Sequence, residues 1–228
     1  MPRVDVVTIP RRSSSLARGA PVSKGRLESF SDGIFAIAIT LLVLTIAQPT
    51  DYSDLAGQLV RRWPSLAAYA VSFVVIGIMW LNHHSVFGHI GRVDRGLVYL
   101  NMLLLLTVAF LPYPTGVFGE ALRQGDGARA AAAVYSITMA LNAYAWGALW
   151  LYASLRRRLL NEAFPESQRF VATLLFLLGT VVYTVSVGIA FINAYACLAF
   201  HALLAAYYAL DPVGRYAARA AVRAESAA

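Results

Sequence analysis

The stretch RLESFSDGIFAIAITLLVL, residues 26–44, places three charged residues and two serines directly before a long apolar run. A helix of about 20 mainly apolar residues is long enough to cross the hydrocarbon core of a bilayer. The charged residues at its start are Arg26, Glu28 and Asp32. A carboxylate at the edge of the hydrocarbon is costly, so Asp32 either pairs with a polar partner or lies at headgroup depth as an ordinary helix-start charge.

The composition of the whole chain is that of a membrane protein. Of its 228 residues, 59% are hydrophobic and 14% are charged, whereas soluble domains carry about 25% charged residues. The formal net charge of +7 comes from basic residues that flank apolar runs and form no separate basic domain. Membrane topology therefore explains the charge better than nucleic-acid binding. The single cysteine, Cys197, provides no disulfide framework and no Cys-based metal site.

Six apolar segments predict an all-α integral membrane protein with six transmembrane helices in one domain, residues 26–211. The boundary between the last two segments is the least defined, near Val187–Gly188, and a single broken segment there would reduce the count to five. Gly188 and Asn193 are the turn-like residues in this region. The predicted spans are residues 28–47, 65–87, 96–114, 129–153, 169–187 and 189–210.

Both termini are predicted to be cytoplasmic tails on a protein of the prokaryotic cell membrane. Residues 1–25 are basic, contain Ser, Pro and Gly, and have no apolar core followed by a cleavage site, so we expect a disordered tail rather than a signal peptide. Residues 212–228 form the second tail. With both tails inside, fifteen of the nineteen basic residues are cytoplasmic, as the positive-inside rule requires. The four outside are Arg61, Arg62, Arg123 and Arg129.

Helical geometry divides the opening stretch between two faces. At about 100° per residue, Asp32 lies about 140° from Ile37 around the helix axis. Nearly every position of a membrane helix is apolar, so the spacing alone does not identify a pore. The stripe that contains Ile37 consists of Arg26, Phe30, Gly33, Ile37, Leu41 and Leu44, with Thr40 at its edge.

A second group of polar residues lies on the same predicted side of the membrane as Asp32. The second span ends in WLNHHS, residues 80–85, and the third span carries Asn101 near its start. Adjacent histidines point in different directions, so we expect no two-His metal site. We expect His83 or His84 to bond to Asp32 and to form one cluster with Asn101 that holds three helices together. The alternative is that Trp80 and the histidines are interfacial belt residues.

The sequence RLESFSDG at residues 26–33 fits the R-x-x-x-F-S-D signature of the transmembrane protein 175 family of potassium channels. The resemblance includes the following apolar run, WLNHH at 80–84 and the segment from Asn101 to LPYP at 111–114, and covers residues 26 to about 115. It implies a homotetramer of six-helix subunits in membrane lipid, with the first helices around a central pore. Such a channel passes potassium in preference to sodium, down its gradient, and needs no cofactor.

The resemblance also implies roles for individual residues. Ile37 matches the narrowest point of the pore, with Leu41 and Leu44 one and two turns further out. Thr40 matches a hydroxyl layer that contributes to selectivity. The structural and gating network joins the signature residues to the second and third helices, and comprises Arg26, Phe30, Ser31, Asp32, Trp80, His83, His84 and Asn101.

Two other classes of function fit parts of the sequence. A proton-coupled secondary transporter would use Asp32 or the His pair, but the sequence shows none of the internal symmetry that transporters of two inverted halves carry. An enzyme needs a convergent acid, base or metal set, and the candidates are few: Asp32, His83, His84 and His201. His201 is alone in its apolar segment, so we expect it to be packed and hydrogen-bonded. We therefore expect no catalytic residues and no metal site.

Overall fold

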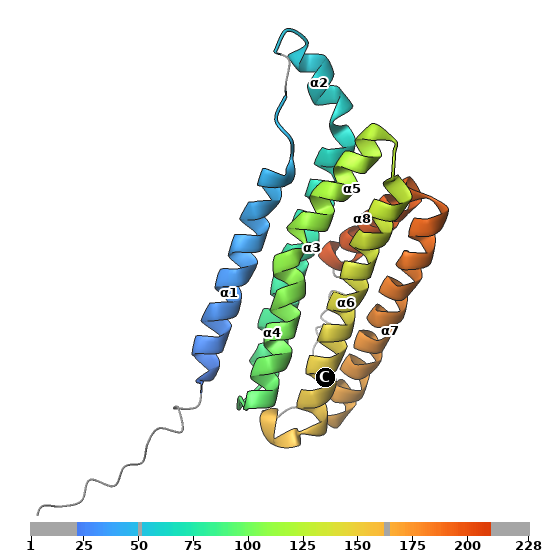
Figure 1. The fold of residues 1–228 in the computed structure, drawn as a ribbon. Helices are drawn as coiled ribbons and strands as arrows, with labels where there is room; N and C mark the ends of the chain where they lie inside the picture. The colour runs from blue at the N-terminus through green and yellow to red at the C-terminus, as the bar shows by residue number, and fades with distance from the viewer. Residues whose placement is uncertain (1–21, 50–51, 162–164, 211–228) are drawn as a thin grey trace, which may run out of the picture.

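The computed structural model describes residues 22–49, 52–161 and 165–210, and these form a bundle of helices (Figure 1). An isolated bridge between Ile90 and Leu160 is the one extended pairing within these ranges. The helices are α1 (Lys24–Leu41), the 3-10 helix η1 (Leu42–Thr45), α2 (Leu55–Arg61), α3 (Trp63–His89), α4 (Arg95–Phe110), α5 (Pro112–Gln124), α6 (Ala128–Leu155), the 3-10 helix η2 (Arg157–Leu159), α7 (Glu166–Ile192) and α8 (Ala194–Leu210).

Within the described ranges, four helical segments are long and apolar enough to cross a membrane: Lys24–Thr45, Trp63–His89, Arg95–Gln124 and Gln168–Ile192. The prediction of an all-helical chain of the membrane type is confirmed. Helix α6 has 28 residues but is less apolar and buries many polar side chains, and α8 is a shorter apolar helix. The count of six spans depends on these two helices and stays a prediction.

The helix ends differ from the predicted segments at the N-terminus. Helix α1 begins at Lys24, inside the tail predicted for residues 1–25, because the Ser23 side chain accepts a hydrogen bond from the Arg26 N–H and caps the helix. Residues 1–21 and 212–228, which contain the rest of both predicted tails, lie outside the described residues.

The third predicted segment, 96–114, ends too early. The backbone stays helical at Leu111 and continues through α5 to Gln124. Pro112 and Pro114 lie in the first turn of α5, where proline lacks only an N–H that the turn does not require. The two prolines therefore interrupt the helical hydrogen bonding, but α4 and α5 together still form one continuous helical segment.

The boundary between the last two helices lies at Asn193 and not at Val187–Gly188. The Asn193 backbone is extended, with φ −152°. Its side-chain oxygen accepts a hydrogen bond from the Ala196 N–H at 3.0 Å, which is the bond of a helix N-cap. Asparagine therefore stops α7 and starts α8, whereas Gly188 continues α7. The short helix α2 was not predicted from the sequence.

Helix α6 lies at the centre of the packing. It contacts α7 along its length and also contacts α4 and α5, whereas α3 contacts α1, α5 and α8. Small residues of α6 that are buried include Ala132, Ala145 and Ala153, and small residues let membrane helices approach closely. Helices α1 and α7 consequently lie at opposite edges of the bundle (Figure 1).

The connection between α4 and the end of α6 is polar. Asp94 caps α4 by accepting the Leu97 N–H at 2.9 Å, and the Tyr152 hydroxyl donates to the same carboxylate at 3.1 Å. Burial raises the pKa of the Asp94 carboxyl, but these hydrogen bonds and the nearby arginines outweigh it and hold that pKa below its usual range. The ionised carboxylate therefore joins the start of α4 to the end of α6.

The far end of the first helix is anchored by Arg62, at the start of α3. Its guanidinium donates to the backbone oxygens of Ala47 at 2.6 Å and Gln48 at 2.8 Å. Only 9% of Arg62 is exposed, so water does not replace these bonds readily. The neighbouring Arg61 is exposed and pairs with Asp54 at 2.5 Å. Arg62 therefore determines where the chain leaves η1.

We predict that Arg62→Met lowers the free energy of unfolding by about 2 kcal/mol, because hydrogen bonds to a buried charged group contribute about 1.5–3 kcal/mol. Arg61→Met is the matched control and should change it little, since exposed ion pairs contribute little. Thermal unfolding of the purified protein in detergent measures both. Equal losses in the two variants would contradict the anchoring role of Arg62.

Candidate functional site

Helix α1 buries only one narrow face against the rest of the bundle. The buried side chains are spaced three or four residues apart, as expected for one face of a helix. They contact α3 and α4. The helix therefore has a fixed rotation about its own axis, with Ile34 and Ile39 packed beside the buried face and the opposite face exposed. The buried residues are Leu27, Ser31, Phe35, Ala38 and, in η1, Leu42.

The predicted stripe lies on the exposed side of this helix. Ile37 is 56% exposed and Leu44 is 76% exposed. The helix changes from α to 3-10 geometry at Leu42, so rotation at 100° per residue does not apply beyond that point, yet Leu44 remains on the outside. The other exposed members of the stripe are Arg26, Phe30, Gly33, Thr40 and Leu41.

A chain of buried polar side chains joins α1, α4 and α3. Asn101 on α4 donates through Nδ2 to Ser31 Oγ on α1 at 3.0 Å. Its Oδ1 lies 3.0 Å from His83 Nε2 on α3. Because Oδ1 can only accept, His83 Nε2 carries the proton. At most 1% of each of these three residues is exposed. Asn101 and His83 therefore join three helices, but Ser31 takes the place that the prediction gave to Asp32.

Aromatic rings enclose His83. The Phe87 ring stacks on it at 4.2 Å between centroids, and Phe35 of α1 meets it edge-on at 5.4 Å. Trp146 of α6 lies 6.1 Å away. These rings keep water from competing for the hydrogen bond to Asn101 and fix the plane of the imidazole.

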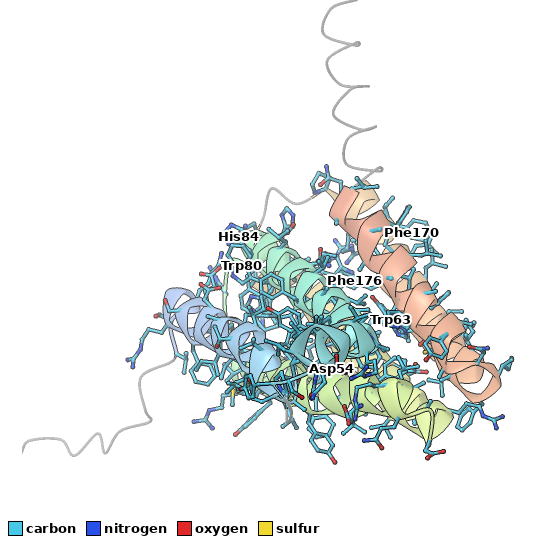
Figure 2. The ribbon with its side chains drawn as sticks, turned by 90° about the horizontal axis from the view of Figure 1, so that it is seen from above. Asp54, Trp63, Trp80, His84, Phe170 and Phe176 are labelled. Atoms are coloured by element: carbon cyan, nitrogen blue, oxygen red, sulfur yellow. The ribbon has the colours of Figure 1, made fainter. Side chains whose placement is uncertain are left out.

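Asp32 has a different partner from the one predicted. Trp80 Nε1 donates to Asp32 Oδ1 at 2.9 Å, so the predicted bond from a histidine to Asp32 is wrong. His84 lies beside Trp80, with 6.3 Å between ring centroids, as Figure 2 shows at one end of α3. The reason is helical rotation: Trp80 and His84 share a face, whereas His83 points inward toward α4.

The signature residues 26–32 thus divide between two roles. Ser31 is buried in the chain through Asn101, and Asp32 is held at the surface by Trp80. Arg26 and Phe30 lie on the exposed side with the predicted stripe. One part of the signature therefore orients the helix, and the other part faces away from the subunit.

A second buried polar cluster, which was not predicted from the sequence, lies in the other half of the bundle. Ser72 Oγ lies 2.9 Å from Thr115 Oγ1 and 3.1 Å from the Tyr135 hydroxyl, which joins α3, α5 and α6. The sequence pattern indicates this cluster only weakly, because isolated hydroxyl residues are common in membrane helices. His201 is packed and hydrogen-bonded as predicted, with Nδ1 2.9 Å from the Cys197 carbonyl oxygen. The described residues contain no cluster of His, Cys, Asp or Glu suited to a metal ion.

We predict that Asn101→Leu lowers the free energy of unfolding by about 1–3 kcal/mol, because it leaves the buried His83 and Ser31 without their shared partner. Asn82→Leu, at an exposed position of α3, is the matched control and should cost much less. Thermal unfolding in detergent is again the measurement. A variant at Asn101 as stable as the control would mean that this chain of hydrogen bonds does not hold the helices.

Comparisons with known proteins agree with this geometry. The family model described as endosomal/lysosomal potassium channel TMEM175 matches residues 26–112. A potassium channel of Streptomyces collinus is 46% identical over 191 residues, which are 83% of this chain and 93% of that protein. A potassium channel of Chamaesiphon minutus is 38% identical over 190 residues, 82% of this chain and 93% of the relative.

The fold is also similar to a solved structure. The crystal structure of a lysosomal potassium-selective channel TMEM175 homolog from Chamaesiphon minutus superposes with a TM-score of 0.74 at 37% identity. The match covers 82% of this chain and 96% of that one. Sequence relatives and fold agree over nearly the same share of the chain, and the family model covers the helices that contain the signature and its partners. This chain belongs to the TMEM175 family.

Proposed function

We propose that this chain is the subunit of a potassium-selective channel, through which ions pass down their gradient. The observation that carries the proposal is the exposure pattern of α1: one face is fixed to the bundle, and the opposite face presents Ile37, Leu41 and Leu44 outward. Relatives that share most of their length with this chain are named potassium channels. A channel needs no catalytic residues and no cofactor, and the permeant ion is potassium.

The proposed assembly is a homotetramer in the bacterial plasma membrane. The stripe lies on the outer surface of one subunit, so a pore lined by it requires further copies around a common axis. Each subunit would contribute six spans, with both termini in the cytoplasm. The excess of basic residues at the cytoplasmic connections supports this orientation, and α1 at the edge of the bundle supports its place beside the axis (Figure 1).

Four Ile37 side chains around the axis would form a hydrophobic constriction. Such a constriction closes by excluding water, because a cation cannot cross a dry apolar ring. A small outward movement of α1 readmits water and a partly hydrated ion. Leu41 and Leu44 would continue the apolar wall toward the other end of the pore.

Thr40 is suited to contact a cation beside this constriction. Its hydroxyl donates its proton to the Ile37 carbonyl at 2.9 Å. The oxygen lone pairs are therefore free to face the exposed side of the helix. Four such oxygens in a ring would replace part of the water around a cation, and potassium loses its hydration water at a lower cost than sodium.

The hydrogen-bonded network would control the position of the stripe. Rotation of α1 that turns Ile37 away from the axis must stretch the bonds from Asn101 to Ser31 and from Trp80 to Asp32. These bonds lie in the middle of α1, and Arg62 holds the segment that follows η1. The pore-lining face is consequently supported at two places.

Flux in liposomes tests the proposed function. The purified protein is reconstituted, and potassium and sodium fluxes are compared under an imposed gradient. A channel gives rapid potassium flux that does not saturate and needs no coupling ion. Flux that saturates or requires a proton gradient would overturn the proposal in favour of a proton-coupled transporter that uses Asp32 or the His pair.

We predict that Ile37→Asn raises the resting potassium flux severalfold, because an amide ring holds water where an aliphatic ring excludes it. Ile37→Val keeps an apolar ring and serves as the control, with flux near that of the unmodified protein. The same liposome assay measures both variants. If Ile37→Asn conducts no more than Ile37→Val, Ile37 does not form the constriction.

A further inference from the structure

A large pocket lies between α3, α6, α7 and α8, away from the stripe on α1. Its volume is about 680 Å³, within the range of about 300–1,000 Å³ that is typical of ligand pockets. The wall is mainly aliphatic and aromatic. Representative residues from the four helices are Met79, Val86, Trp146, Leu175, Phe176 and Ala205.

Four polar side chains line one end of the pocket, and Asn142, Tyr183, Tyr207 and Tyr208 add single polar groups to the rest of the wall. Asn82, Ser85 and His89 lie in the last turns of α3, and Gln168 lies in the first turn of α7. These turns belong to the same end of the bundle, since the bridge between Ile90 and Leu160 joins the segments that follow α3 and α6. The pocket thus has an apolar body and a polar end, which matches an amphiphilic ligand.

The pocket lies on the side of the subunit that faces lipid in the proposed assembly. Helix α7 lies at the edge opposite α1 in both views, with Phe170 and Phe176 marking it in Figure 2. Of the four candidate spans, α7 buries the smallest share of its apolar window, 11%. With α1 at the axis of a channel, α7 is at the periphery, and acyl chains have direct access to the pocket.

The polar end lies beside a basic surface. The segments that join the helices there, residues 88–95 and 155–169, contain six arginines and three carboxylates. Arg169 directly follows the lining residue Gln168 and donates to the Ser154 carbonyl oxygen at 3.1 Å. Arg157 and Arg158 are exposed, although they pair with Glu166 and Asp94. The net positive charge attracts an anionic headgroup at the depth of the membrane surface.

We propose that this pocket holds an acyl chain of an anionic phospholipid, whose phosphate lies among these basic residues. The apolar wall accommodates the chain, and the polar end accommodates the glycerol and ester oxygens. The positive charge distinguishes an anionic lipid from a zwitterionic one. Neither the relatives' names nor the proposed ion path assigns this pocket a ligand.

Occupancy of the pocket would act on α3, which also provides Trp80 and His83 to the hydrogen-bonded network with α1 and α4. Met79 and Asn82 of α3 line the pocket, whereas Trp80 and His83 of the same turns contact the network of α1. Trp146 lines the pocket and also lies 6.1 Å from His83. This coupling rests on the proposed function, and the access of lipid to the pocket rests on the proposed arrangement of subunits, whereas lipid retention is measured without ion flux.

Two glycines of α7 provide a matched pair of variants. Gly179 lines the pocket, and a Cβ there meets nothing within 4 Å, so Gly179→Leu adds a side chain into open space. A Cβ at Gly188 also meets nothing within 4 Å, but Gly188 does not line the pocket. It lies nine residues later, which places it on the opposite face of the helix. Gly188→Leu is therefore the control, and Ala172→Leu, on the same face as Gly179, is a second filling variant.

Native mass spectrometry of the detergent-solubilised protein measures lipid retention with added phosphatidylglycerol or phosphatidylcholine. We expect the unmodified chain and Gly188→Leu to retain phosphatidylglycerol in preference to phosphatidylcholine. We expect Gly179→Leu and Ala172→Leu to lose the bound phosphatidylglycerol. Equal retention of the two lipids, or equal retention in all four proteins, would overturn the proposal. Absence of retained lipid from the unmodified chain would also overturn it, and would leave residues 211–228, which follow α8, as the occupant to consider.

Potassium flux in liposomes with and without phosphatidylglycerol tests the coupling separately. We expect phosphatidylglycerol to change flux through the unmodified chain and through Gly188→Leu, but not through Gly179→Leu. Loss of lipid retention with an unchanged lipid response would overturn the coupling and leave the site intact. Absence of flux in every protein would concern the proposed function and not the lipid site.

Discussion

The position of the first helix depends on the hydrogen bonds of one buried amide. Asn101 uses its NH₂ group toward Ser31 and its carbonyl oxygen toward His83, so a single side chain specifies how three helices meet. Between apolar helices in lipid, hydrophobic burial supplies little drive for association, and packing and polar contacts decide the arrangement. The aromatic rings around His83 keep this contact dry.

Because α1 is held along one face, the position of its opposite face is fixed as well. Helix α1 buries one narrow face, with Ile34 and Ile39 partly buried beside it, and leaves the opposite face exposed. An exposed apolar face of this kind is unfavourable in water, but it suits a helix that faces a symmetry axis. The same rotation of α1 about its axis buries Ser31 and turns Ile37 outward. The hydrogen-bonded network and the proposed constriction therefore both depend on that rotation.

Helix α3 connects the regions of the subunit that carry function. Its start holds the far end of the first helix through Arg62, and its end provides Trp80 and His83 to the network. Its remaining face borders the pocket beneath α7 and α8. In the proposed channel, a change in either the pore or the pocket would therefore reach the other through α3.

The sequence by itself determined the class of protein and the two faces of the first helix, because length, hydropathy and helical period are local properties. It also identified Asp32, His83 or His84, and Asn101 as polar residues in need of partners. Only the tertiary structure decided which partner each one has, that α5 extends the third segment, and that a pocket opens under α7. Partner choice depends on the rotation of neighbouring helices: one residue of shift turns a side chain by about 100°, and no local pattern records how two distant helices are rotated against each other.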